Sequence, residues 1–342
     1  MKHPVNQGRR YITFAAGFAA FDIILNACIN RGFDLPVRNP LSGQWIVDRD
    51  VLDWHEWRNL KEKYPIVLGL TWLFFTSGSS LTLASDFNTS SNNFFGIGAG
   101  AGGQPGGTSS SPCPCVGTQS GNGGNGGGGG AFAGIANYSA HGAGQVVSIQ
   151  VGAGATIFDS SSVLLANAAS GQTGGNGASS VGSSKATGGN GGSGGPGVFG
   201  PAPSGGGGGG GGGAAGPGAN GNSGANGGSG APNTGIGGGG GAGGVGGGST
   251  PAGSNGTQFG PNASSQFVGP GGGGRGGQGG YAGFPQHPTN GGFYGAGGAG
   301  GGGGGGTGGQ VGDNGSNATQ GLLAYDYTPS ASHTRSFAIL VG

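Results

Sequence analysis

Glycine is concentrated in one long stretch, and this feature constrains the fold more than any other. Of the 98 glycines among 342 residues, 90 lie between Gly96 and Gly315. Such a stretch has few apolar side chains to bury, and ordering each backbone residue costs about 1–2 kcal/mol, with glycine at the high end. We therefore expect it to be ordered only if its N–H and C=O groups satisfy one another almost completely.

Three kinds of structure have a composition of this type. Collagen needs glycine strictly at every third position, but here the period is repeatedly interrupted, and the chain has only 18 prolines. A flexible linker does not explain the strand-like islands that punctuate the stretch. Packed extended helices of polyproline-II geometry remain, and glycine recurs at every third residue in several runs, such as 188–200 and 271–283. The sequence thus favours a bundle of polyglycine-II helices.

The islands predict β-strands. Residues 135–152 contain Val147, Ile149 and Val151 in alternation, as in a half-buried strand. Residues 156–166 and 321–327 are further islands, and residues 66–75 form a continuous apolar, β-branched and aromatic run typical of a buried strand.

The N-terminal part has ordinary composition. It holds all four tryptophans, and 17 of the 23 charged side chains lie in residues 1–86. Residues 10–30 are mostly apolar and predict a packed helix ended by Arg31 and Gly32. An export signal or membrane segment is an alternative for this run, although Asp22 in its middle disfavours burial in lipid. A second helix is expected over residues 47–64, with acidic residues at its start and Pro65 at its end.

The sequence lacks the residues that several classes of function require. The 12 basic and 11 acidic residues give a net charge of +1, so the chain lacks the excess of basic residues that nucleic-acid binding requires. The five histidines are scattered, and residues 87–320 contain only two carboxylates, Asp159 and Asp313, so no nucleophile, base and acid can be assembled. Cys113 and Cys115 form a pair with no second pair. We expect no enzymatic activity, no cofactor and no metal site.

A family resemblance adds to this interpretation. Residues 72–107 begin with an aromatic-Thr-Ser-Gly strand and continue into glycine-rich sequence. Residues 126–155 contain a glycine run, a strand, a turn and a second strand that ends in Val-Gly-Ala-Gly. Residues 176–192 supply a small-residue turn, and residues 321–327 (GLLAYDY) supply a closing strand. In this order the elements resemble the glycine-rich domain of phage tail-fibre and tail-tip proteins. The long glycine-rich insertion of residues 188–317, which precedes the closing strand, is similar to the polyglycine-helix adhesins at the tips of T-even-type tail fibres.

Composition and the resemblance together predict a domain organisation. Residues 1–70 would be a small α-helical attachment domain with a buried strand, and residues 71–187 a β-sandwich-like glycine-rich domain. Residues 188–318 would be an insertion of packed polyglycine-II helices with aromatic loops, and residues 319–342 the closing strand and a C-terminal tail.

The same resemblance implies a non-enzymatic virion protein, a tail-fibre tip or receptor-binding adhesin that recognises a bacterial outer-membrane protein or surface glycan. The expected receptor-binding residues are the ring-bearing side chains between the glycine runs: Phe199, Phe259, Phe267, Tyr281, Phe284, His287, Phe293 and Tyr294. Trp45, Trp54 and Trp57 are expected to attach the chain to other virion or tail-fibre proteins. A homotrimer and a single-copy tip are both compatible with the family. Alternatives are a structural spike or fibre protein without a receptor role, and a bacterial secreted glycine-rich matrix protein.

Overall fold

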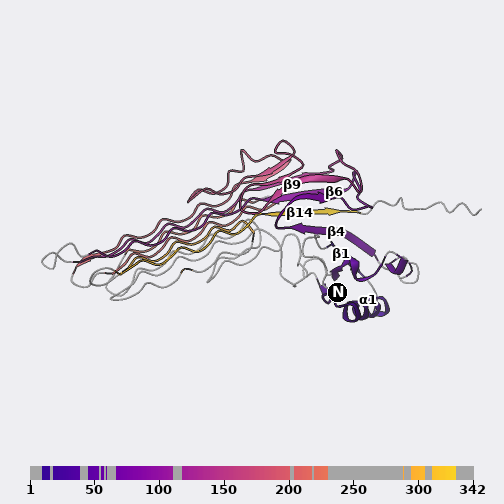
Figure 1. Ribbon diagram of the computed structural model, residues 1–342, viewed down its shortest axis with the longest axis horizontal. Coiled ribbons are helices and arrows are strands. Elements are labelled where there is room, and N and C mark those ends of the chain that lie inside the picture. Colours follow the sequence, from indigo (N-terminus) through magenta and orange to yellow (C-terminus); the bar gives the residue numbers. More distant parts are fainter. Residues whose placement is uncertain are drawn as a thin grey trace, which may run out of the picture.

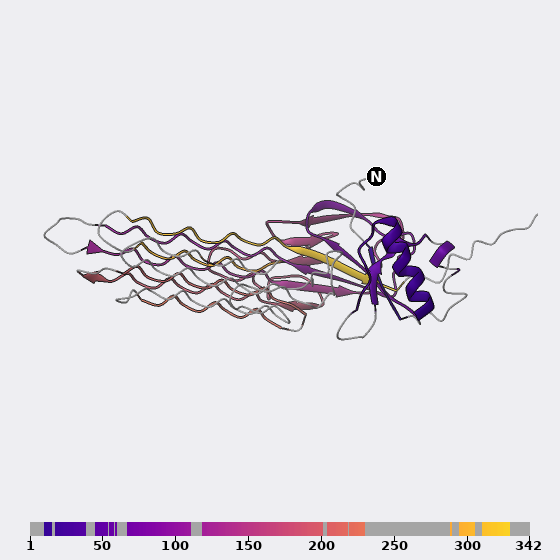
Figure 2. The same cartoon turned by 90° about the horizontal axis from the view of Figure 1, so that it is seen from below.

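Two antiparallel sheets form one end of the molecule, and long extended segments project from them (Figures 1 and 2). The computed structural model describes residues 10–15, 18–38, 45–53, 55–57, 59, 67–110, 118–200, 204–217, 219–229, 288, 294–304 and 310–328. Within this part the protein is mostly β-structure with few helices.

The larger sheet has eight strands, and all its neighbours pair antiparallel. In spatial order these are β12 (Ser184–Ala186), β8 (Phe132–Ala136), β6 (Asn92–Ile97), β14 (Leu322–Tyr327), β4 (Val67–Phe75), β1 (Arg10–Ala15), β3 (Trp45–Asp48) and β2 (Val37–Arg38). The last strand of the chain, β14, therefore lies in the middle of the sheet. The expectations of a strand over 66–75 and of a closing strand over 321–327 are confirmed.

The smaller sheet has four strands, which in order are β11 (Leu164–Ala166), β10 (Thr156–Phe158), β9 (Val146–Val151) and β5 (Gly78–Thr82). Along β9, Val147, Ile149 and Val151 are buried while the intervening residues are exposed, as their alternation predicts. The expected island at 156–166 is the hairpin of β10 and β11.

The main core lies between these two sheets. Phe94 of β6 and Tyr325 of β14 stack at 4.8 Å between ring centroids, and Phe94 also stacks on Phe158 of β10 at 3.9 Å. Leu164 and Ile149 of the smaller sheet complete the same cluster. Two sheets that pack face to face around such a core form a β-sandwich.

Alternate residues of β14 pack into two different hydrophobic clusters. Leu323 and Tyr325 belong to the cluster between the sheets, whereas Leu322 and Ala324 belong to a second cluster on the opposite face of the larger sheet. All six residues of β14 are buried, which explains why apolar residues occur on both faces of this strand.

The prediction of a helix over residues 10–30 is wrong for residues 10–15. Residues 10–15 form β1, which pairs with β4 on one side and with β3 on the other. The aromatic and β-branched residues of 11–14 suit a strand, and two neighbouring strands are available to pair with them. The helix α1 is Phe18–Arg31, and Gly32 ends it with φ +71° while Phe33 N–H donates to Cys28 C=O at 3.0 Å. This C-terminal cap is the one that Arg31-Gly32 predicts.

The helix expected over residues 47–64 is wrong in its first turn and a half. Val47 lies in β3, where it pairs with Ile12, and the 3₁₀ helix η1 (Arg49–Val51) follows. Residues 55–57 and 59 are helical, and residues 60–66 lie outside the described part. The sheet hydrogen bonds of Val47 take precedence over its helical spacing to Val51 and Trp57.

The N-terminal part is therefore not a helical unit. Of its described residues, those of β1, β2, β3 and the start of β4 belong to the larger sheet, and α1 packs on η1 and β3 through a small core that contains Ile24, Cys28, Val47 and Val51. The expected boundary between residues 70 and 71 falls inside β4, so the sheet continues across it.

Candidate functional site

In the part of the chain that the structure describes, seven extended segments run side by side away from the sandwich, and together we call them the glycine rod (Figures 1 and 2). In chain order they are residues 98–107, 121–131, 187–197, 205–215, 220–228, 295–304 and 310–320. They are numbered below from the first to the seventh segment.

Hydrogen bonds between the segments recur at every third residue. The second segment donates from the N–H groups of Gly121, Gly124, Gly127 and Gly130 to the carbonyls of Gly304, Gly301, Gly298 and Gly295 in the sixth segment, over 2.7–2.9 Å. The residue numbers fall along one segment as they rise along the other, so these two segments are antiparallel.

The residues between these donors face other segments. Gly123, Gly126 and Gly129 donate to Gly195, Gly192 and Gly189 in the third segment, each at 2.8 Å. The carbonyls of Gly121, Gly124, Gly127 and Gly130 accept from Gly206, Gly209, Gly212 and Ala215 in the fourth segment. Successive residues of one segment thus bond to different neighbours, which satisfies buried backbone groups without a sheet.

Close approach of the backbones explains why glycine is needed. A Cβ atom on Gly123 would overlap the carbonyl of Gly207, and one on Gly209 would overlap the carbonyl of Gly192. At Gly102, by contrast, the nearest atom to an added Cβ is 3.5 Å away, an ordinary contact. The rod therefore requires glycine at the positions between segments and tolerates side chains at the outward positions.

Asparagine and serine occupy outward positions and bond back to the rod. Asn125 Oδ1 and Asn122 Oδ1 accept from Gly194 N–H and Gly197 N–H, both at 2.9 Å. Asn220, Ser223 and Asn226, again three residues apart, accept from the N–H groups of Thr187, Asn190 and Ser193. We did not single out these residues from the sequence, although their spacing of three within glycine runs is a usable signal.

The rod is anchored at its proximal end, where it meets the sandwich. Ile97 and Phe132 lie where β6 and β8 border the first two segments, and they pack with Ala214 and Ala215 of the fourth segment in the second cluster of the larger sheet. All four are fully buried. This apolar contact joins the rod to the sheet that also carries the N-terminal strands.

The opposite, distal end carries a small sheet of two strands, β7 (Thr118–Gln119) and β13 (Phe199–Gly200), drawn as two short arrows at the far left of Figure 2. Ser120 Oγ donates to Val198 C=O at 2.8 Å and links the residues next to these two strands. Val198 is 39% exposed and Val311 of the seventh segment is 64% exposed. The distal end thus presents apolar side chains to solvent.

The structure separates two of the expected receptor-binding residues. Phe199 lies in β13 at the distal end, whereas Tyr294 lies at the proximal end, half-buried against the second cluster. The second segment runs between these ends, and its ten residues 121–130 span about 30 Å at an extended rise of about 3.1 Å per residue. Phe259, Phe267, Tyr281, Phe284, His287 and Phe293 lie outside the described residues.

The expected attachment residues that the structure describes belong to the N-terminal core. Trp57 is 8% exposed, and its indole N–H donates to Arg49 C=O at 2.8 Å. Trp45 packs against the same core, with its ring 4.4 Å from that of Phe21. Trp54 lies outside the described residues. The large hydrophobic side chains that the described residues of this part expose are aliphatic: Ile23 and Ile29 of α1 and, after the helix, Leu35.

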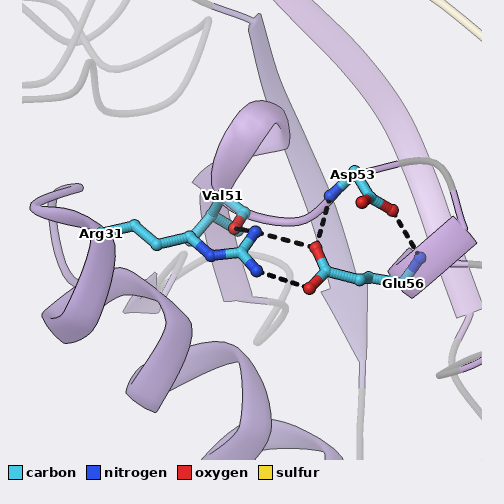
Figure 3. A network of polar contacts seen from close by, with 4 residues as sticks. All are labelled: Arg31, Val51, Asp53 and Glu56. Carbon is cyan, nitrogen blue, oxygen red and sulfur yellow. Dashed lines mark hydrogen bonds and ion pairs between the residues drawn. The ribbon is translucent and has the colours of Figure 1, made fainter.

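A polar network ties α1 to the following turn (Figure 3). Arg31 donates to Val51 C=O at 2.9 Å and forms a two-pronged ion pair with Glu56. Asp53 and Glu56 each accept a hydrogen bond from the other's N–H, both at 2.8 Å, which is a capping box. The hydrogen bond from Arg31 lowers the pKa of Glu56 below its ordinary value.

A second, more buried ion pair joins the N-terminal part to the closing strand. Arg49 of η1 pairs with Asp86 at 2.6 Å, and Tyr327 OH of β14 donates to Asp86 at 2.8 Å. Burial acts to raise the pKa of Asp86, but the hydrogen bonds from Arg49 and Tyr327 outweigh it and lower the pKa below the ordinary value. This network fixes η1 against the centre of the larger sheet.

The remaining titratable groups are few. Tyr138 OH donates to Asp159 at 2.8 Å, and His141 lies 3.5 Å from the same carboxylate. Asp326 is buried in β14, where Asn93 donates to it, and burial raises its pKa to about 6. In the part of the chain that the structure describes, no three His, Cys, Asp or Glu side chains are grouped to hold a metal ion. Cys113 and Cys115 are outside that part.

The described helices are all too short or too polar to cross a membrane. No protein-family model matches the chain, and no curated protein or solved structure is significantly similar to it.

Proposed function

We propose that this chain is a non-enzymatic receptor-binding adhesin of a phage tail-fibre tip, in which a rod of packed polyglycine-II-like helices holds a host-contacting end away from the particle. The resemblance of residues 72–328 to tail-fibre glycine-rich domains motivates this proposal. The observation that carries it is the three-residue period of hydrogen bonds between the glycine segments.

The period supports the polyglycine-II interpretation for a geometric reason. A three-fold extended helix turns each residue's N–H and C=O outward, by one third of a turn relative to the residue before, so it bonds to its neighbours rather than to itself. Gly123, Gly124 and Gly126 bond to the third, sixth and third segments in this way. A rod locked by such bonds is stiff without an apolar interior.

The distal end is the proposed contact surface. Loops on a rigid scaffold commonly carry binding residues, and between Gly96 and Gly315 the chain has only four charged residues. A nearly uncharged end with exposed Val198 and Val311 suits a bacterial outer-membrane protein or a surface glycan. Of the aromatic set, Phe199 is the member with a described place at this end.

The N-terminal end is the proposed attachment side. It lies at the other end of the molecule, and Ile23 and Ile29 of α1 are 40% and 60% exposed. We propose that these exposed side chains of α1, rather than the tryptophan cluster, contact another virion or tail-fibre protein. The assembly is proposed to be a virion component, with a homotrimer compatible with the family.

Binding of purified protein to host cells tests the adhesin proposal. Val198→Asp and Val311→Asp place a charge at the distal end and are expected to reduce cell binding at least tenfold, about 1.4 kcal/mol. Val146→Asp is the matched control, because Val146 is 63% exposed on β9 of the sandwich. Undiminished binding by both distal variants, or no binding by the unaltered protein, would reject the proposed contact surface and favour a purely structural role.

A further inference from the structure

Asparagine precedes glycine at seven places in the described part of the chain, and this pair has an intrinsic chemistry. The backbone nitrogen of the glycine can attack the asparagine side-chain carbonyl, because glycine has no side chain to obstruct the approach. The seven asparagines are Asn122, Asn125, Asn176, Asn190, Asn220, Asn226 and Asn314.

Six of these sites have the attacking nitrogen engaged. The N–H groups of Gly123, Gly126, Gly191, Gly221 and Gly227 donate to backbone carbonyls of other segments or loops at 2.8–2.9 Å. Gly177 N–H donates to Thr187 Oγ1 at 3.1 Å. To react, each of these amides must first leave its partner and move out of the packed structure, which requires local opening.

Asn314 differs from the other six. Its side chain is exposed, like those of five of the others, but Gly315 N–H has no hydrogen-bond partner among the residues that the structure describes. The segment is held on either side, since Asp313 N–H donates to Gly302 C=O at 2.9 Å and Ser316 N–H to Ala299 C=O at 2.8 Å. Asn314 N–H donates to Asp313 Oδ1 at 2.8 Å, so the Gly315 amide is the donor left without a partner between these two fixed points in the part of the chain that the structure describes.

We propose that Asn314 is a site of spontaneous deamidation in the folded protein. The Gly315 nitrogen loses its proton to solvent base and attacks Asn314 Cγ, forming a C–N bond and a succinimide ring. The bond from Cγ to the side-chain nitrogen breaks, and ammonia leaves with a proton from solvent. Water then adds to either ring carbonyl and opens the ring, giving aspartate or isoaspartate.

The product changes the seventh segment locally. It places a second carboxylate next to Asp313, near the distal end of the rod, where Asp313 C=O accepts from Gly106 N–H. Isoaspartate also adds a carbon to the main chain between the bonds of Asp313 and Ser316, which interrupts the three-residue period there. This inference does not depend on the proposed function.

The test is peptide mapping of the full-length folded protein after incubation in mildly alkaline buffer. A protease that cleaves after aromatic residues and leucine is needed, since residues 87–320 offer trypsin only Lys185 and Arg275. Mass spectrometry then measures the conversion of amide to acid at each of the seven sites. A parallel sample in denaturant gives the rates for the unfolded chain.

In the folded protein, Asn314 is expected to convert about tenfold or more faster than Asn122, Asn125, Asn190, Asn220 and Asn226. These five sites must first open locally, and even a modest opening free energy slows the deamidation rate about tenfold. In denaturant the seven rates are expected to lie within a few-fold of one another. Asn314→Gln should abolish the fast conversion. Equal rates at all sites in the folded protein, or a protected Asn314, would overturn the proposal.

Discussion

Asn125 lies across from Gly194, and its side-chain oxygen accepts a hydrogen bond from the Gly194 amide at 2.9 Å. The pair shows how the rod satisfies a backbone donor that no neighbouring glycine segment reaches. Asn122, three residues before Asn125, accepts in the same way from the amide of Gly197, which lies three residues after Gly194.

Removing this acceptor should destabilise the rod. Asn125→Ala leaves the part-buried Gly194 N–H without a partner, and we expect a loss of about 1–3 kcal/mol. Asn222→Ala is the control, since Asn222 is exposed and bonds through its backbone carbonyl. Thermal unfolding followed by calorimetry measures both variants. Equal melting temperatures for the two would show that the asparagine caps are dispensable.

A methyl group should distinguish inward from outward glycines. Gly209→Ala forces apart the third and fourth segments, since its Cβ would overlap the carbonyl of Gly192, and we expect a loss of more than about 3 kcal/mol. Gly102→Ala meets its nearest atom at 3.5 Å and should be neutral or stabilising by up to about 1 kcal/mol. The same calorimetric measurement applies, and a tolerated Gly209→Ala would contradict the close packing.

Hydrogen exchange tests the bonding pattern directly. The amides of Gly124, Gly127 and Gly130 donate between segments, so we expect them to exchange slowly in the native protein. Gly315, whose amide has no partner in the described part of the chain, should exchange quickly. Rapid exchange along the whole second segment would mean that the rod is open to water, and the adhesin proposal would lose its scaffold.

Asp326 should make the protein less stable above pH 6 than below pH 4. Its pKa in the folded state, about 6, lies above the ordinary value near 3.9. The folded state therefore binds the proton more tightly, and its contribution to stability falls as the pH rises from about 4 to about 6 and is constant above. Asp326→Asn removes this loss and should stabilise the protein at neutral pH by about 2–3 kcal/mol.

Unfolding of this variant and of the unaltered protein at several pH values measures the effect. The variant's oxygen can still accept from Asn93, which donates to Asp326 at 2.8 Å. A difference in stability that does not change between pH 4 and pH 7 would show that Asp326 keeps an ordinary pKa.

The two ion pairs of the N-terminal part should differ in strength. Arg49→Met leaves Asp86 unpaired in a largely buried site, with 15% of that side chain exposed, and we expect a loss of about 2–4 kcal/mol. Arg31→Met breaks an exposed pair with Glu56 and should cost much less, because solvent screens it. Denaturant unfolding compares the two. The order would be reversed if η1 were not held against the closing strand.

Several elements could be predicted from local patterns. The alternation of Val147, Ile149 and Val151 predicts β9, and the apolar run 66–75 predicts β4. The C-terminal cap at Gly32 follows from Arg31-Gly32. In each case the residues that form the element carry the signal themselves.

Other elements depended on partners that lie far away in the chain. Residues 10–15 and Val47 have helix-compatible patterns, but each finds a strand to pair with in the larger sheet. Trp57, expected on an attachment surface, lies in the core because η1 offers its carbonyl to the indole. No local pattern indicates such partners.

The amino-acid sequence by itself determined that the long middle stretch could be ordered only through its own backbone, since glycine supplies no side chains to bury and no steric bar to close approach. Only the tertiary structure decided which segments lie side by side, which amides they share and which two strands pair at the distal end. The reason is physical: near-identical glycine runs offer the same donors and acceptors in many registers, and the choice among them is made by the outward asparagines and by the alanines that anchor the rod to the sandwich.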